Sequence, residues 1–155
     1  MQTEIVLLLP NIRSCHNVGA MFRTADAFGI AKLYLIGYTA TPPKIQIDKV
    51  SLGAETWVPW EKRETLDATI AELREQGYVI VALEKTVSSI DIAEWNATHT
   101  SAQHIALIVG NEVDGVEEQV LALCDAVVHI PMQGRKESLN VSIASGVAMY
   151  ALRHG

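Results

Sequence analysis

Short apolar runs alternate along this chain with longer segments whose apolar residues recur at helical spacing. The apolar runs predict buried strands at 5–9, 32–37, 78–83, 105–109 and 126–130, and the periodic segments predict helices at about 17–28, 66–76, 116–124 and 139–153. This alternation predicts an α/β fold, a mostly parallel sheet with helices on both faces. Loops at the carboxyl ends of such strands form binding sites.

Two segments depart from the plain pattern. Residues 38–50, with Pro42 and Pro43, predict a long irregular segment, which could be a lid or a loop that contacts the substrate. The last predicted helix is apolar on more than one face and carries Gly146 at its centre, where glycine costs about 1 kcal/mol relative to alanine. Close approach of another helix would explain Gly146, and ordinary core packing is the alternative.

The composition suits one globular domain over residues 1–155, with 49% hydrophobic residues. A net charge of −6 and a pI near 5.3 exclude a general nucleic-acid binder, because phosphate contacts need clustered cations. Four cations nevertheless lie in or beside polar loops, and several acids lie elsewhere. We expect these cations to form a local basic patch and the acids to form an acidic back face; the alternative is that the cations are ordinary solvated charges. The cations are Arg13, Arg23, Arg135 and Lys136, and the acids are Glu61, Glu64, Asp67, Glu72 and Glu75.

Neither export nor metal binding is expected. The apolar runs are far shorter than the roughly 18–20 residues of a membrane span, and the first residues lack the features of a secretory signal. We therefore expect a cytoplasmic protein. Cys15 and Cys124 are far apart and the five histidines are scattered, so reduced thiols and no metal site are expected.

Polar chemistry concentrates in three segments at strand or helix boundaries. These are residues 11–25, 107–116 and 130–145. In the last of them, polar residues 133–137 separate an apolar strand from an apolar helix, so Ser138 and Asn140 lie at a helix start. The simplest role for Ser138 is that of a helix N-cap.

Together and in this order, the three segments resemble the SpoU-type, TrmH-like RNA ribose 2′-O-methyltransferases of the SPOUT superfamily. Residues 51–59 are also similar, so the resemblance covers nearly the whole chain. It implies methyl transfer from S-adenosyl-L-methionine to a ribose 2′-hydroxyl of RNA. It also implies a C-terminal trefoil knot that holds the cofactor, and a homodimer whose interface includes the final helix.

The resemblance assigns roles to ten residues. Arg23 takes the position of the catalytic arginine, Asn17 orients the substrate or Arg23, and Glu112 and Asn140 complete the catalytic set. Arg23 would act either as a base or by electrostatic stabilisation. The cofactor pocket would be lined by Leu83, Gly110, Ile130, Met132, Ser138 and Leu139.

Most of these residues also have a purely structural interpretation. Arg23 could form an ion pair with Asp26 three residues later, and Asn17 could be a helix N-cap. Glu112 could simply be solvated. The remaining alternatives are turn formation for Gly110 and Gly115, and core packing for Ile130, Met132 and Leu139.

The leading hypothesis is thus an RNA 2′-O-methyltransferase. tRNA is favoured over rRNA as its substrate, since the chain begins almost directly with its first strand and shows no separate N-terminal RNA-binding domain. A catalytically silent RNA-binding dimer of the same fold is the alternative that the acidic charge suggests. A generic nucleotide-binding α/β domain is a third possibility, but the chain lacks a GxGxxG or GxxxxGKS loop.

Overall fold

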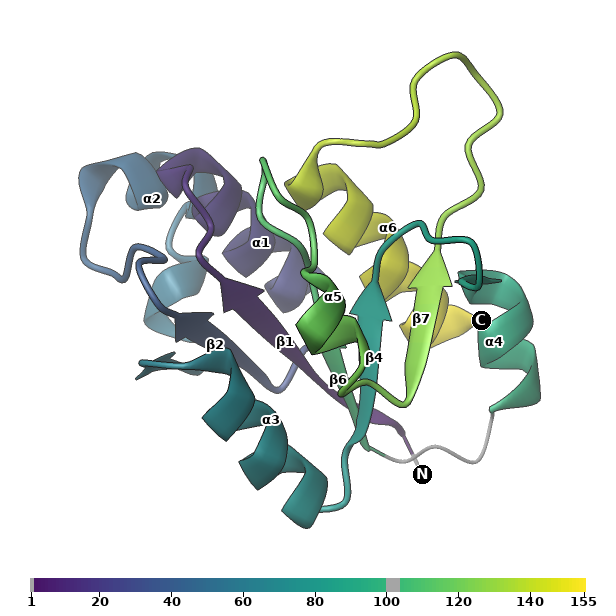
Figure 1. Cartoon of the computed structure of the whole chain (residues 1–155). Coiled ribbons are helices and arrows are strands. Elements are labelled where there is room, and N and C mark those ends of the chain that lie inside the picture. The colour runs from purple at the N-terminus through teal and green to yellow at the C-terminus, as the bar shows by residue number, and fades with distance from the viewer. Residues whose placement is uncertain (1, 100–103) are drawn as a thin grey trace.

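A single parallel sheet organises the molecule, as the alternating pattern predicts. The computed structural model describes residues 2–99 and 104–155 (Figure 1). Within these ranges seven strands pair in the order β3-β2-β1-β6-β4-β7-β5, every pair parallel. They are β1 (Glu4–Pro10), β2 (Lys32–Ile36), β3 (Trp60–Arg63), β4 (Val79–Leu83), β5 (Ile90–Asp91), β6 (His104–Ile108) and β7 (Ala126–His129). All carboxyl ends therefore meet at one edge of the sheet.

The five predicted strands are confirmed, and two edge strands were not predicted. Central β1 is paired on both sides, with Leu7 opposite Leu33 of β2 and Leu107 of β6. A strand covered on both faces is apolar throughout, which is why its pattern is clear. Strands β3 and β5 lie at the two edges of the sheet, and β3 reads Trp-Glu-Lys-Arg. Charged edge strands protect a sheet against further pairing but carry no apolar signal.

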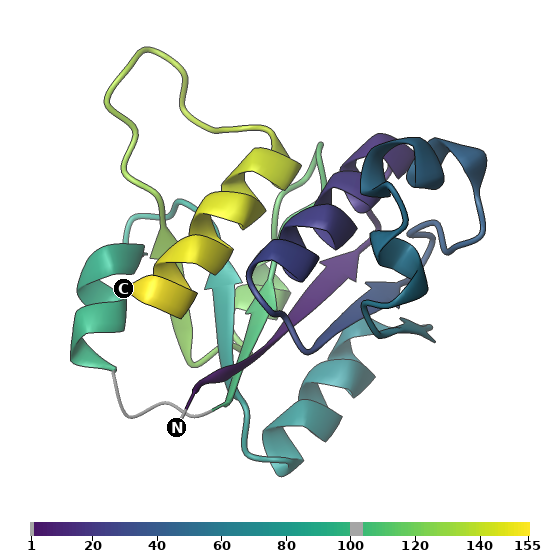
Figure 2. The same ribbon diagram turned by 180° about the vertical axis from the view of Figure 1, so that it is seen from behind.

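Helices cover both faces of the sheet, as predicted. On the face seen in Figure 1 lie α3 (Leu66–Glu75) and the short α5 (Glu118–Leu121), which is shorter than the helix expected at 116–124. The opposite face is seen in Figure 2 and carries α1 (Cys15–Ala27), α4 (Ile92–Thr98) and α6 (Val141–His154). None of the helices in the described ranges has the length and apolar character needed to cross a bilayer.

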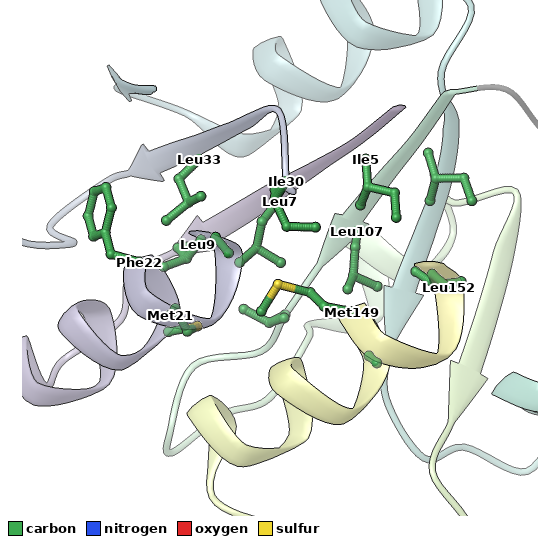
Figure 3. Packing of buried hydrophobic residues seen from close by; sticks show 14 of the residues in the cluster. Ile5, Leu7, Leu9, Met21, Phe22, Ile30, Leu33, Leu107, Met149 and Leu152 are labelled. Carbon is green, nitrogen blue, oxygen red and sulfur yellow. The ribbon is translucent and has the colours of Figure 1, made fainter. Parts of the chain in front are cut away.

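The core forms two layers, one on each face of the sheet. Because side chains alternate along a strand, Ile5, Leu7 and Leu9 of β1 face α1 and α6, whereas Val6 and Leu8 face α3. Figure 3 shows the larger layer, in which Met21 and Phe22 of α1 and Met149 and Leu152 of α6 close over these strands. Burying each such side chain stabilises the fold by about 1.5–3 kcal/mol.

Helices α1 and α6 lie side by side, and Gly146 marks their contact. A Cβ atom at Gly146 would lie 3.3 Å from Cγ2 of Thr24, which is tighter than an ordinary contact. The expected close approach of a second helix is therefore confirmed. The trefoil knot that the resemblance implies stays a prediction.

The expectation of an irregular segment over 38–50 is wrong in its second half. Helix α2 (Ile45–Ser51) forms there, after the cis peptide bond between Pro42 and Pro43, and a 3₁₀ helix η1 (Ala54–Thr56) follows. Buried Ile47 packs α2 against α1, where its carbonyl oxygen would lie 2.6 Å from a Cβ at Gly19. Seven residues are too few for helical periodicity to be recognised, so only this packing reveals the helix.

Candidate active site

A pocket of about 790 Å³ opens at the carboxyl edge of the sheet. Its walls come from the loops that follow β4, β6 and β7 and from the start of α6. Its volume lies in the range of about 300–1,000 Å³ that is typical of small-molecule sites. Eight of the ten predicted site residues line it: Leu83, Gly110, Glu112, Ile130, Met132, Ser138, Leu139 and Asn140. Asn17 and Arg23 do not.

Glu112 joins the β6–α5 loop to the start of α1. One carboxylate oxygen, Oε1, accepts a hydrogen bond from the backbone N–H of Arg13 at 2.8 Å. The other, Oε2, accepts from the N–H of Ser14 and from the side-chain amide of Asn17, both at 2.9 Å. The interpretation of Glu112 as merely solvated is therefore wrong. Asn17, though outside the pocket, is bonded to a residue that lines it.

These contacts favour the ionised form of Glu112. Burial alone would raise the pKa of its carboxyl group, but the hydrogen bonds from the Arg13 N–H, the Asn17 amide and the Ser14 N–H outweigh burial and lower the pKa. A carboxylate beside the first N–H groups of a helix is further favoured by the helix dipole. Glu112 thus carries a fixed negative charge at the junction of two loops.

Both predicted helix caps are shifted by two or three residues. Ser14 caps α1, since its hydroxyl accepts the backbone N–H of Asn17 at 3.1 Å, so Asn17 is not the N-cap but lies buried in the first turn. Asn140 caps α6 by accepting the N–H of Ser142 at 2.9 Å. The N-cap interpretation of Ser138 is wrong, because Ser138 lies exposed in the preceding loop at the rim of the pocket.

The two predicted glycines shape the β6–α5 loop. A Cβ at Gly110 would lie 2.6 Å from the carbonyl carbon of Gly115, so this loop closes only without a side chain there. Gly115 has φ +64°, in the left-handed region. Glu84, which our sequence reasoning missed, accepts the N–H of Val116 at 2.7 Å and ties this loop to the end of β4. An acid directly after a buried strand was the signal that could have found it.

The hydrogen bonds of Glu112 to the start of α1 form a clamp on the β6–α5 loop, and two asparagines extend this clamp to the ends of β1 and β2. The side-chain amide of Asn111 donates to the carbonyl oxygen of Asn11 at 3.0 Å and to the Tyr38 hydroxyl at 3.1 Å. Asn11 accepts the N–H of Tyr38 at 3.0 Å and has φ +52°. The loops after β1, β2 and β6 therefore form one hydrogen-bonded unit. Sequence reasoning did not find these residues.

Most of the β7–α6 loop is exposed and has little contact with the core. Met132 and Leu139 line the pocket and are absent from both core layers, so their core interpretation is wrong. Ile130 is half-buried and touches both the core and the pocket. In the same wall, Nδ1 of His129 lies 2.8 Å from the Ser89 hydroxyl, a second pair that sequence reasoning missed.

Arg23 lies on the exposed face of α1, outside the pocket. The alternative of an ion pair with Asp26 is wrong, because Oδ1 of Asp26 instead accepts the indole N–H of Trp57 at 2.7 Å. Within residues 2–99 and 104–155 the guanidinium of Arg23 has no hydrogen bond, ion pair or ring contact. Arg23 is thus a free cation.

The twelve lysines and arginines sort into two groups. Five bind a carboxylate or a carbonyl oxygen: Lys32, Lys62, Arg63, Arg74 and Arg153. Seven have no side-chain partner in the described part of the chain: Arg13, Arg23, Lys44, Lys49, Lys85, Arg135 and Lys136. These seven lie in the loops around the pocket or on α1 and α2. The four cations expected to form a basic patch are among these seven. Two of the acids expected on the back face, Glu61 and Glu72, form ion pairs with Lys32 and Arg63.

The donor set of the pocket suits an organic ligand. Apolar side chains of Leu83, Ile130, Met132 and Leu139 face it together with carboxylates and loop backbone. Among the described residues, no three His, Cys, Asp or Glu side chains gather as a metal site requires. Both cysteines are free thiols.

An all-parallel sheet with a ligand-sized pocket built from loops at its carboxyl edge defines an α/β ligand-binding protein. The sequence model of the SpoU rRNA Methylase family matches residues 4–150, so this chain belongs to that family. Among curated relatives, the tRNA (guanosine(18)-2′-O)-methyltransferase of Aquifex aeolicus is 33% identical over 150 residues, which are 96% of this chain and 68% of that protein. The 23S rRNA (guanosine-2′-O-)-methyltransferase RlmB of Vibrio vulnificus is 34% identical over 148 residues, 96% of this chain and 58% of that protein.

Solved structures agree with the fold. An AdoMet-bound rRNA methyltransferase from Sinorhizobium meliloti superposes with a TM-score of 0.88 at 27% identity, over 99% of this chain and 57% of that one. The A. aeolicus TrmH/SpoU tRNA modifying enzyme gives 0.85 at 31% identity, over 98% and 75%. The chain therefore spans only about 57–75% of the length of these relatives.

Proposed function

We propose that residues 1–155 form one methyltransferase domain that transfers a methyl group from S-adenosyl-L-methionine to the ribose 2′-hydroxyl of a guanosine in RNA. The observation that carries this proposal is the pocket, since it is walled by the loops that contain two of the three family-like segments. Relatives named as guanosine 2′-O-methyltransferases support the reaction, and the AdoMet-bound structure from S. meliloti supports the cofactor.

The lining of the pocket fits that cofactor. Leu83, Ile130, Met132 and Leu139 offer apolar surface for an adenine ring, and the exposed backbone of the β7–α6 loop offers hydrogen-bonding groups for its edge. The ionised carboxylate of Glu112 supplies negative potential for a cationic ligand. When bound, S-adenosylmethionine supplies a methyl group on a sulfonium sulfur, which needs no metal to activate it.

Arg23 acts by electrostatics in this proposal. A guanidinium stays protonated at neutral pH, so it is a poor base but a strong partner for a phosphate or for a developing alkoxide. Because Arg23 has no partner of its own, it is available to RNA without first breaking an ion pair. Glu112 and Asn17 act indirectly, by holding the start of α1 against the pocket loop.

A homodimer is part of the proposal. Helix α6 exposes an apolar stripe at helical spacing, in which Ile143, Val147 and Tyr150 are 42–57% exposed, and Leu139 extends it at the pocket rim. Such a continuous apolar stripe indicates a protein interface. A second copy seated there would also explain why Arg23 lies outside the pocket of its own chain, since α1 lies beside α6 (Figure 2).

For the substrate we propose tRNA rather than rRNA, and therefore a cytoplasmic enzyme. The relatives include both kinds of enzyme at similar identity. In support of tRNA, relatives from A. aeolicus, Thermus thermophilus and Escherichia coli are named as tRNA (guanosine(18)-2′-O)-methyltransferases.

The test is a methyl-transfer assay with labelled S-adenosylmethionine on separate tRNA and rRNA fractions, followed by nucleoside mass spectrometry. We expect 2′-O-methylguanosine in tRNA. Arg23→Ala should lower turnover at least 100-fold, whereas Arg74→Ala, which removes an exposed arginine of α3 bonded to Leu123, should not. Donor binding without any methylated product in either fraction would favour the silent RNA-binding dimer.

A further inference from the structure

Trp57 is an exposed aromatic ring that the protein holds in place. Its side chain is 59% exposed, whereas Trp95 is buried and Trp60 is half-buried. The indole N–H donates to Asp26 at 2.7 Å, and a Cβ at Gly53 would lie 3.3 Å from Cζ3 of the six-membered ring. The indole is therefore anchored through its N–H, and much of its surface remains open to solvent.

The acid that anchors Trp57 lies beside a free cation. Arg23 and Asp26 are three residues apart on α1 and thus neighbours on its surface. The Asp26 carboxylate binds Trp57 and forms no ion pair with Arg23. Two further cations without a partner, Lys44 and Lys49, lie on or beside α2, which packs against α1. Trp57 follows η1, which contacts both α1 and α2, the helices at which these unpaired cations lie.

We propose that Trp57 is the stacking platform of a binding subsite for an unpaired RNA base, next to a backbone phosphate held by Arg23. The inference rests on the proposed function, because it takes RNA as the ligand. Aromatic rings flanked by cations are how proteins bind unpaired nucleotides, through stacking on the base and charge pairing with the backbone. A ring that is already fixed loses little conformational entropy on binding.

The position of Trp57 favours RNA over a second copy of the chain as the occupant. Thr24 faces α6 through its contact with Gly146, and Asp26, two residues later, lies on the other side of α1. Trp57 follows η1 and is bonded to Asp26 on this other side of α1. A polyanion matches the unpaired cations, whereas a copy with a net charge of −6 has no such charge advantage.

The test is an RNA-binding titration without S-adenosylmethionine, using an unmodified tRNA transcript. We expect Trp57→Leu, which keeps an apolar side chain but no ring, to raise the Kd about 5- to 150-fold. Trp57→Phe, which keeps a ring but loses the bond to Asp26, should raise the Kd less than Trp57→Leu does. The control Ile45→Ala, which trims another exposed apolar side chain, should change the Kd less than threefold. An unchanged Kd for Trp57→Leu would overturn the proposal.

A double variant separates stacking from the freeing of Arg23. In Trp57→Leu with Asp26→Asn, no carboxylate remains to neutralise Arg23, so binding should stay weak if the ring itself stacks on a base. Recovery of the wild-type Kd would overturn stacking. Loss of dimer in Trp57→Leu by sedimentation would also overturn it, since Trp57 would then bind a second copy.

Tryptophan emission gives a measurement that needs no variant of Trp57. In a Trp60→Phe background, we expect the tRNA transcript to quench the emission and heparin, a polyanion without bases, not to do so. Equal quenching by both would contradict stacking. Because the donor is absent, failure here is distinct from failure of the proposed function, which would appear as missing methyl transfer by a wild-type protein that binds RNA.

Discussion

Replacing Glu112 by alanine tests the clamp between the pocket loop and α1. The change removes the acceptor of three hydrogen bonds, from Arg13 N–H, Ser14 N–H and the Asn17 amide. The two backbone N–H groups are exposed, so water replaces the carboxylate at a cost of about 0.5–1 kcal/mol each. Asn17 is only 5% exposed, so its unpaired amide costs about 1–2 kcal/mol more.

The free energy of unfolding should therefore fall by about 2–4 kcal/mol, which for a chain of this size lowers Tm by roughly 4–16 °C. Urea denaturation followed by circular dichroism measures the change. Asp114→Ala is the matched control, because Asp114 lies on the same loop and its side chain accepts no hydrogen bond among the described residues. It should stay within about 0.5 kcal/mol of wild type.

A double-mutant cycle isolates the buried partner. In an Asn17→Ala background the cost of Glu112→Ala should shrink by about 1 kcal/mol or more, since the orphaned amide is gone. Equal costs in both backgrounds, or a cost below about 0.3 kcal/mol in the wild type, would refute the reasoning. The hydrogen bonds of Glu112 would then contribute little to the free energy of unfolding.

The remaining predictions address pH, the pocket loop, the caps and the dimer. The pKa of Glu112 is lower in the folded chain than in the unfolded one. Its contribution to the free energy of unfolding is therefore full above the unfolded pKa of about 4.3 and is lost as the pH falls through the folded pKa. In parallel urea titrations, the stability difference between wild type and Glu112→Gln should shrink as the pH falls below about 4.3. Gly110→Ala should cost about 1–3 kcal/mol and weaken donor binding in calorimetry, because its Cβ meets Gly115 at 2.6 Å; normal binding would show that the loop yields easily. Asn140→Ala should cost about 0.5–2 kcal/mol as a lost cap, and Ser138→Ala almost nothing; equal Tm losses would contradict the cap assignment. Ile143→Asp should give monomers in sedimentation if α6 forms the dimer interface; a variant that sediments as wild type would contradict that interface.

Most of the central architecture could be predicted because it depends on burial. Strands β1, β4 and β6 are covered on both faces, so their apolar runs are easily recognised. The alternation of these runs with segments of helical spacing predicts helices on both faces of the sheet. Elements whose character comes from their neighbours could not be found in this way. Edge strand β3 is charged, and α2 is too short for its periodicity to be read.

For the site, the resemblance of three segments to a known family was sufficient to select most of the pocket lining, and the fold brings those residues together because the carboxyl ends of parallel strands meet at one edge. The partners of those residues were another matter. Three contacts depend on the tertiary structure. Glu112 binds the start of α1, nearly 100 residues away, Asn140 rather than Ser138 caps α6, and Asp26 binds Trp57 instead of Arg23. Local spacing offers several acceptors for each donor, and only the packing of distant loops against one another selects among them.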